Sequence, residues 1–195
     1  HNISPQISNL TSDFNKDSDL FELEEIDFKH IENNYLDYER EPLMPERLSI
    51  EGPAYVSSDF NGDGVKDIFI GGAKLQSPKL LIQTSEGLFN EVNNLVFSQD
   101  SQFEDVDAAA FDFDQDGDMD IYVMSGGNEY VDGDPNLMDR LYINNGNAVF
   151  NKFPANLPST NGGSISSADF NNDGYPDLFI GSRSIPGGYG LSPIS

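Results

Sequence analysis

The sequence predicts an all-β protein assembled from repeated four-stranded antiparallel units, and three observations support this fold class. An acidic segment containing glycine occurs three times within the 195 residues. Short runs of small or apolar residues flank every copy, which is typical of strands on both sides of a loop. The best candidate for an amphipathic helix is Phe21–Glu32, and it alternates apolar and polar residues about as well as it fits a helix.

The three acidic segments share one pattern, and their starts are 53 and 57 residues apart. They read DFNGDGVKDIFIGG from Asp59, DFDQDGDMDIYVMSGG from Asp112 and DFNNDGYPDLFIGS from Asp169. Small residues precede each segment and an apolar run ends it, so the acidic part joins the first strand of a unit to the second. Self-similarity at such a period indicates a repeat architecture.

A hairpin pattern supplies the third and fourth strands of a unit. Leu80–Val92 and Leu141–Phe153 each contain two apolar runs separated by a polar turn with glycine. A four-stranded antiparallel unit repeated at this period is typical of β-propeller blades. Because propellers close with about 4 to 8 blades, the sequence predicts an incomplete propeller of about three blades, with a calcium loop between the first and second strands of each.

The chain divides into a polar segment at 1–20, a strand or hairpin at 21–50 that leads into the propeller, and repeats at 51–195. The last unit is truncated before its outer hairpin, so we expect either a piece of a longer protein or a sheet completed by another copy. An open blade edge favours such pairing, and therefore homo-oligomers. The repeats are placed at about 51–103, 104–160 and 161–195.

Charge and composition exclude several kinds of partner and chemistry. The 34 acidic and 10 basic side chains give a net charge of −24, which repels nucleic acid and anionic membranes. The absence of cysteine excludes disulfides, thiolate metal sites and cysteine nucleophiles. No segment approaches the roughly 20 apolar residues of a membrane helix. We therefore expect no direct membrane insertion, and the polar first residues predict a mature or trimmed chain.

The spacing of the acidic residues predicts calcium sites. Calcium takes about 6 to 8 oxygen ligands, and carboxylates on alternate residues of a tight loop converge on one point. Glycine at the sixth place permits the turn, so the turn glycines are Gly64, Gly117 and Gly174 rather than Gly62. The ligands are side chains at places one, three, five and nine and the backbone carbonyl at place seven. They are Asp59, Asn61, Asp63, Val65 and Asp67 in the first loop, Asp112, Asp114, Asp116, Asp118 and Asp120 in the second, and Asp169, Asn171, Asp173, Tyr175 and Asp177 in the third.

Other interpretations of these loops fit less well. An EF-hand needs a bidentate Glu at the twelfth place, where Ile70, Val123 and Ile180 stand. Magnesium prefers to keep several waters over an all-protein cage. Solvated turns without metal are the simplest alternative, but three copies with the same glycine and the same following strand favour real sites. We expect about three Ca²⁺ ions, which would also stabilise the fold by relieving repulsion among the carboxylates.

These segments resemble the FG-GAP or VCBS repeats of integrin α-subunit propellers and of many secreted bacterial proteins. DFNGDGVKDIFIGG and DFDQDGDMDIYVMSGG match the calcium loop and strand end, and LYINNGNAVF resembles the closing hairpin. Within the family the sequence is most similar to bacterial relatives of cartilage acidic protein, the ASPIC/UnbV group, through Phe28, His30, Glu32 and Arg40–Leu43. The resemblance implies a propeller of about seven blades and an extracellular, periplasmic or cell-surface location.

The loops after the second strands lie at the opposite end of the sheets from the calcium loops and vary more in sequence. Varied loops on a repeated scaffold are where binding specificity usually lies. The alternative is that they carry solvated residues or salt-bridge partners. The candidate ligand-binding residues are Asn128, Glu129, Tyr130, Arg140, Arg183 and Tyr189.

The sequence favours a binding function over catalysis. It contains no G-x-S-x-G, P-loop or H-E-x-x-H motif, so we predict no catalytic residue. His30, the one internal histidine, fits a packed or surface residue better than a general base. We expect a calcium-stabilised interaction module for a protein or glycan partner. The alternatives are part of an extracellular enzyme acting on polysaccharide and a purely structural spacer.

Overall fold

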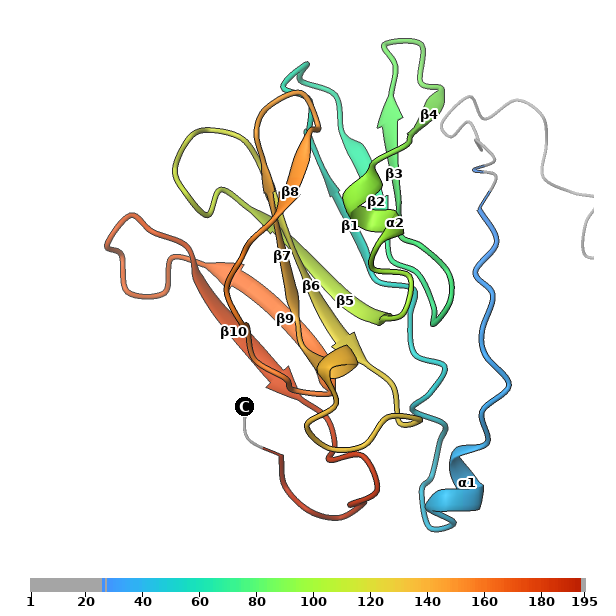
Figure 1. The fold of residues 1–195 in the computed structure, drawn as a ribbon. Coiled ribbons are helices and arrows are strands. Elements are labelled where there is room, and N and C mark those ends of the chain that lie inside the picture. Colours follow the sequence, from blue (N-terminus) through green and yellow to red (C-terminus); the bar gives the residue numbers. More distant parts are fainter. Residues whose placement is uncertain (1–25, 27, 194–195) are drawn as a thin grey trace, which may run out of the picture.

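The computed structural model describes residues 26 and 28–193, and these form three antiparallel sheets arranged one after another along the chain (Figure 1). The first strands of the sheets, β1, β5 and β9, contact one another in sequence order. The predicted all-β fold of propeller-like blades is therefore confirmed. The sheets of the described part of the chain do not close into a ring.

The first two sheets each contain four strands in sequence order, and the third contains two. In the first sheet the strands are β1 (Tyr55–Ser58), β2 (Asp67–Ile70), β3 (Lys79–Gln83) and β4 (Phe89–Val92). In the second they are β5 (Glu104–Phe111), β6 (Asp120–Gly126), β7 (Arg140–Asn144) and β8 (Phe150–Lys152). In the third they are β9 (Gly162–Ala168) and β10 (Asp177–Ser182). All neighbouring strands are antiparallel.

The hydrophobic core lies between neighbouring sheets, so β6 in the middle sheet is buried on both faces. Successive side chains of a strand point to opposite faces. Val123 accordingly joins the cluster shared with the first sheet, and Met124 joins the cluster shared with the third. Because both faces of β6 are covered, consecutive residues of this strand are apolar instead of alternating with polar ones.

Within the described residues, helix is confined to short pieces. The helix α2 (Leu95–Ser98) has four residues and follows β4. It places the ring of Phe97 5.0 Å from that of Tyr142, between the first two sheets. A single 3₁₀ turn, η1 (Pro135–Leu137), precedes β7. No helix in the described ranges has the length and apolar character needed to cross a membrane.

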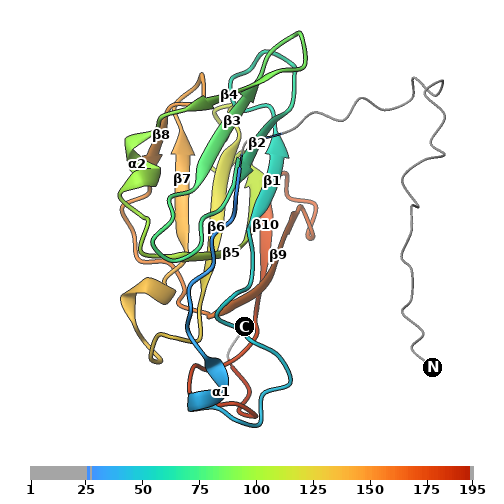
Figure 2. The same ribbon diagram turned by 90° about the vertical axis from the view of Figure 1, so that its right-hand side faces the viewer.

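The described part of the segment at 21–50, residue 26 and residues 28–50, contains no strand and only one short helix, α1 (Asp37–Arg40), so there it differs from the predicted strand or hairpin. The predicted polar segment at 1–20 lies outside the described residues. The chain runs along the length of the sheets toward α1 (Figure 2). The amide of Gln76 binds it by donating to Lys29 O at 2.7 Å and accepting from Ile31 N at 3.0 Å. A side chain thus satisfies the backbone groups that a neighbouring strand would otherwise bind.

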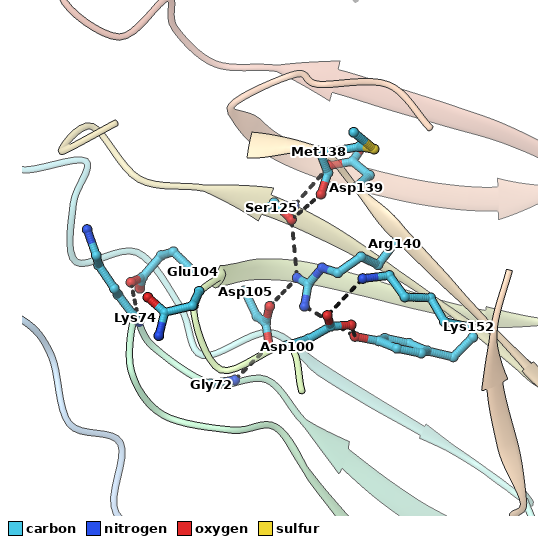
Figure 3. Close-up of polar contacts among 12 residues, drawn as sticks. Gly72, Lys74, Asp100, Glu104, Asp105, Ser125, Met138, Asp139, Arg140 and Lys152 are labelled. Atoms are coloured by element: carbon cyan, nitrogen blue, oxygen red, sulfur yellow. Dashed lines mark hydrogen bonds and ion pairs between the residues drawn. The ribbon is translucent and has the colours of Figure 1, made fainter. Parts of the chain in front are cut away.

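The first two sheets are joined at Asp105 in β5, a residue only 1% exposed. One carboxylate oxygen accepts from Arg140 Nη2, and the other accepts from Gly72 N at 2.8 Å. The backbone of Asp105 also accepts from Ala54 N at 3.0 Å and donates to Gly72 O at 2.9 Å. Asp105 therefore connects the ends of the first sheet to β7 of the second (Figure 3).

The guanidinium of Arg140 is itself enclosed, with 1% of the residue exposed. It donates to Ser125 Oγ at 3.2 Å and to Tyr142 Oη at 3.3 Å, and it lies 4.1 Å from the ring centre of Phe103. Burial lowers the pKa of Arg140, but the carboxylate of Asp105 outweighs this effect and raises the pKa above its usual value. The cation is therefore kept charged inside the protein.

We predict that Arg140→Met lowers the free energy of unfolding by about 3–5 kcal/mol, because Asp105 stays buried without its cation. Urea unfolding in calcium measures this change. The matched control is Arg183→Met, whose side chain is 38% exposed and pairs with the exposed Glu46 and the partly buried Glu51. It should cost at most about 1 kcal/mol. Equal losses in the two variants would contradict the assignment of Asp105 and Arg140 as the junction.

Candidate functional site

The three acidic loops occupy equivalent places in the three sheets. Each joins the first strand of its sheet to the second, and Asp67, Asp120 and Asp177 begin β2, β6 and β10. All three loops lie at the end of the sheets away from α1 (Figure 1). Those of the second and third sheets touch, since Gln115 Nε2 donates to Gly174 O at 3.4 Å. The repeated sequence pattern thus produces a row of similar loops on one end of the molecule.

The aspartate at the first place organises the loop through backbone hydrogen bonds. In the first loop Asp59 accepts from Asp63 N at 3.1 Å with one oxygen and from Gly64 N at 2.7 Å with the other. The same two bonds recur from Asp112 to the N–H groups of Asp116 and Gly117, and from Asp169 to those of Asp173 and Gly174. The loops therefore share one backbone geometry as well as one sequence.

The aspartate at the ninth place ties the loop to its sheet. Asp67 is fully buried, and its oxygens accept from Phe60 N and Gln83 N, both at 2.9 Å. Asp120 makes the equivalent bonds at 2.7 and 2.8 Å, and Asp177 accepts from Phe170 N at 3.0 Å. Burial raises the pKa of Asp67 and of Asp120. Because each carboxylate oxygen has two lone pairs, these bonds leave acceptor capacity for a cation.

The second loop has the densest group of carboxylates. Oxygens of Asp112, Asp114 and Asp116 lie within 4.8 Å of one another, whereas Asp120 is outside this group. In the first loop Asn61 takes the third place and donates to Asp63 at 2.9 Å, and Asn171 does the same to Asp173 at 3.0 Å in the third. The second loop therefore combines more negative charge with fewer internal donors than its two neighbours.

The seventh-place residues point their peptide N–H groups inward. These groups donate to the fifth-place carboxylate at 2.8 to 2.9 Å. The carbonyls of the same residues are the predicted backbone ligands. The residues are Val65, Asp118 and Tyr175.

Two turn positions, rather than one, have positive φ in each loop. The sixth-place glycines have φ of 87°, 98° and 89°, as the sequence predicts for Gly64, Gly117 and Gly174. The fourth place is also left-handed, with φ of 76°, 62° and 60° at Gly62, Gln115 and Asn172. Sequence reasoning missed this second turn, although Gly and Asn favour positive φ and were a usable signal.

Four of the six candidate ligand-binding residues point into the protein rather than toward solvent. Arg40 Nη1 donates to the carbonyls of Asn128 at 3.0 Å and Tyr130 at 2.5 Å, and Arg40 Nη2 donates to Pro186 O at 3.1 Å. Glu41 accepts from Asn128 Nδ2 at 2.8 Å. The segment around α1 thus covers this loop. The buried candidates are Asn128, Glu129, Tyr130 and Arg140.

The other two candidates, Arg183 and Tyr189, lie together. They line a cleft of about 410 Å³, which Glu46 and Leu48 complete from the segment after α1. Arg183 pairs there with Glu46, and Tyr189 is 49% exposed. Of the residues predicted to bind a ligand, these two are the ones that the structure brings to an open surface.

The repeats match a known protein family. The FG-GAP-like repeat matches residues 59–123 and 112–180. Each match starts at the first aspartate of an acidic loop and ends in the strand that follows the next loop. Together the two matches extend over more than half of the chain. A search of curated proteins found no match.

The loop geometry predicts that Gly64→Ala destabilises the protein while Gly64→Asn has a smaller effect. A Cβ at Gly64 would meet no atom within 4 Å, so the cost comes from its φ of 87° alone. A left-handed residue with a side chain costs about 1–2 kcal/mol, and Asn tolerates this conformation better than Ala. Urea unfolding in calcium-free buffer measures both variants. The predicted strain would be contradicted if Gly64→Ala did not lower the free energy of unfolding, or lowered it no more than Gly64→Asn does.

Proposed function

Because the chain belongs to the FG-GAP-like repeat family, we propose that it is a calcium-binding module of a secreted or surface protein that binds a protein or glycan partner. FG-GAP repeats are typical of extracellular interaction modules. The observation that carries the proposal is the threefold acidic loop, with the same hydrogen bonds in every copy. The likeness to the ASPIC/UnbV group stays a prediction.

The loops are suited to calcium because their backbone is already arranged around the carboxylates. The peptide N–H groups hold the first-place and fifth-place side chains in position, so binding an ion orders few additional groups. Asp112, Asp114 and Asp116 would supply oxygen ligands in the second loop, and Asn61 and Asn171 would contribute amide oxygens in the other two. With five aspartates in its nine residues against three in each neighbour, the second loop should bind most tightly.

The cleft lined by Arg183 and Tyr189 is the proposed partner surface. It lies among the segments near α1, at the opposite end of the sheets from the acidic loops. A half-exposed aromatic ring beside an ion pair offers both an apolar face and polar groups, which suits a sugar or a polar peptide. The net charge of −24 favours a neutral or cationic partner.

A binding screen separates this role from the alternatives. Arrays of glycans and of extracellular proteins are probed with the full chain in millimolar calcium, together with Arg183→Ala and Tyr189→Ala. Binding that both variants lose supports the proposed cleft. Cleavage of a bound polysaccharide would instead favour an enzyme, and the absence of any partner would favour a structural spacer.

We predict that calcium raises the melting temperature relative to chelator, because a ligand that binds only the folded state stabilises it by mass action. Isothermal titration should count about three ions. Asp114→Ala should weaken the tightest site at least tenfold, since it removes a charged ligand from the second loop.

The control for this titration is Asp132→Asn, which alters an exposed acidic residue outside the loops. Its calcium affinities and stoichiometry should match those of the unaltered chain. The calcium assignment of the second loop would be overturned if calcium gave no heat of binding, or if Asp114→Ala left the affinity of the tightest site unchanged.

A further inference from the structure

A second group of metal-ligating side chains lies outside the acidic loops, at His30, Glu32 and Glu104. One ligand atom from each residue lies within 4.8 Å of the others. Glu104 begins β5 and is completely buried. His30 and Glu32 come from the extended segment before α1, and their side chains are 15% and 27% exposed. The group therefore combines one enclosed carboxylate with two ligands that solvent reaches.

Three atoms of this group are buried without a hydrogen-bond partner: His30 Nδ1, Glu32 Oε2 and Glu104 Oε1. The group has two short contacts, from His30 Nε2 to Glu32 Oε1 at 2.6 Å and from Lys74 N to Glu104 Oε2 at 2.8 Å. Buried polar atoms are nearly always paired, and leaving a carboxylate oxygen unpaired is costly. The unpaired atoms point to a ligand that supplies their partner.

Within the described residues the group has little positive charge of its own, because Glu32 pairs with His30, which is cationic only when protonated. The ammonium of Lys74 lies 3.7 Å from Glu129 Oε1 and 4.2 Å from the ring centre of Tyr130, and no ion pair of the described residues reaches Glu104. A bound cation would supply the positive charge that Glu104 lacks.

The backbone on which the ligands stand is fixed before any ion binds. Gln76 bonds the residues on either side of His30, through Lys29 O and Ile31 N. Glu104 is held by its register opposite Gly126 in β6. Ligands carried by a fixed backbone lose little conformational freedom on binding, which favours a specific metal site over a chance grouping of charges.

We propose that His30, Glu32 and Glu104 bind one divalent transition metal ion such as zinc. Imidazole nitrogen together with carboxylate oxygen is a donor set of the zinc class, whereas calcium takes oxygen ligands alone. In a tetrahedral shell two ligand atoms lie about 3.3 Å apart, given bonds of about 2.0–2.1 Å. The ligand atoms of the group lie within 4.8 Å of one another, so small side-chain movements that also open the 2.6 Å contact between His30 Nε2 and Glu32 Oε1 would bring them to this spacing. Three protein ligands leave a fourth position for water, on the side opened by His30 and Glu32.

The test uses the full chain, stripped with chelator and then returned to excess calcium so that the oxygen-only loops are filled. Zn²⁺ is titrated calorimetrically, and Co²⁺ is followed by the visible absorption that reports tetrahedral coordination. We expect one ion per chain. His30→Gln and Glu104→Gln should each weaken binding at least tenfold, whereas the control His1→Gln, which changes the other histidine of the sequence, should leave it unchanged.

Several outcomes would overturn the site. These are no Zn²⁺ or Co²⁺ binding in calcium, unaltered binding in His30→Gln and Glu104→Gln, or loss of binding in His1→Gln alone. Near-ultraviolet circular dichroism shows whether each variant is folded. If Glu104→Gln does not fold, the test uses Glu32→Gln, which changes the partly exposed ligand. A tenfold loss of metal affinity in this variant supports the site, and an unchanged affinity refutes it.

Discussion

The burial of Asp105 against Arg140 is the interaction on which the arrangement of the first two sheets depends. The carboxylate of Asp105 bonds Gly72 of the first sheet to Arg140 of β7, and the backbone of Asp105 in β5 bonds Ala54 and Gly72. Since adjacent side chains of a strand point to opposite faces, Glu104 extends away from Arg140 toward Lys74 (Figure 3). The start of β5 therefore supplies both the junction between sheets and the buried ligand of the proposed metal site.

The repeats could be predicted from sequence because their determinants are local. The acidic loop, the positive φ at Gly64 and the alternation of the following strand all lie within about fifteen residues, so a pattern read along the chain captures them. The fourth-place turn was missed although Gly62 and Asn172 favour the left-handed region, and only Gln115 in the second loop carries no such preference.

The surroundings of the variable loops could not be predicted in the same way. Arg140 follows a polar, loop-like stretch and reads as exposed, yet it is enclosed by Asp105 and Phe103 from an earlier part of the chain. The segment after residue 28 has no strand partner because side chains such as Gln76 bind its backbone. The grouping of His30 with Glu104 likewise depends on where that segment runs, which no periodicity specifies.

Arg40 joins parts of the chain that are far apart in sequence. Each sheet is built from strands adjacent in sequence, and such local pairing forms quickly. The guanidinium of Arg40, in contrast, bonds carbonyls of Asn128, Tyr130 and Pro186, the last 146 residues away. These bonds can form only after Pro186 has been synthesised. The end of the molecule that holds the Arg183 and Tyr189 cleft therefore depends on contacts between parts of the chain that are far apart in sequence.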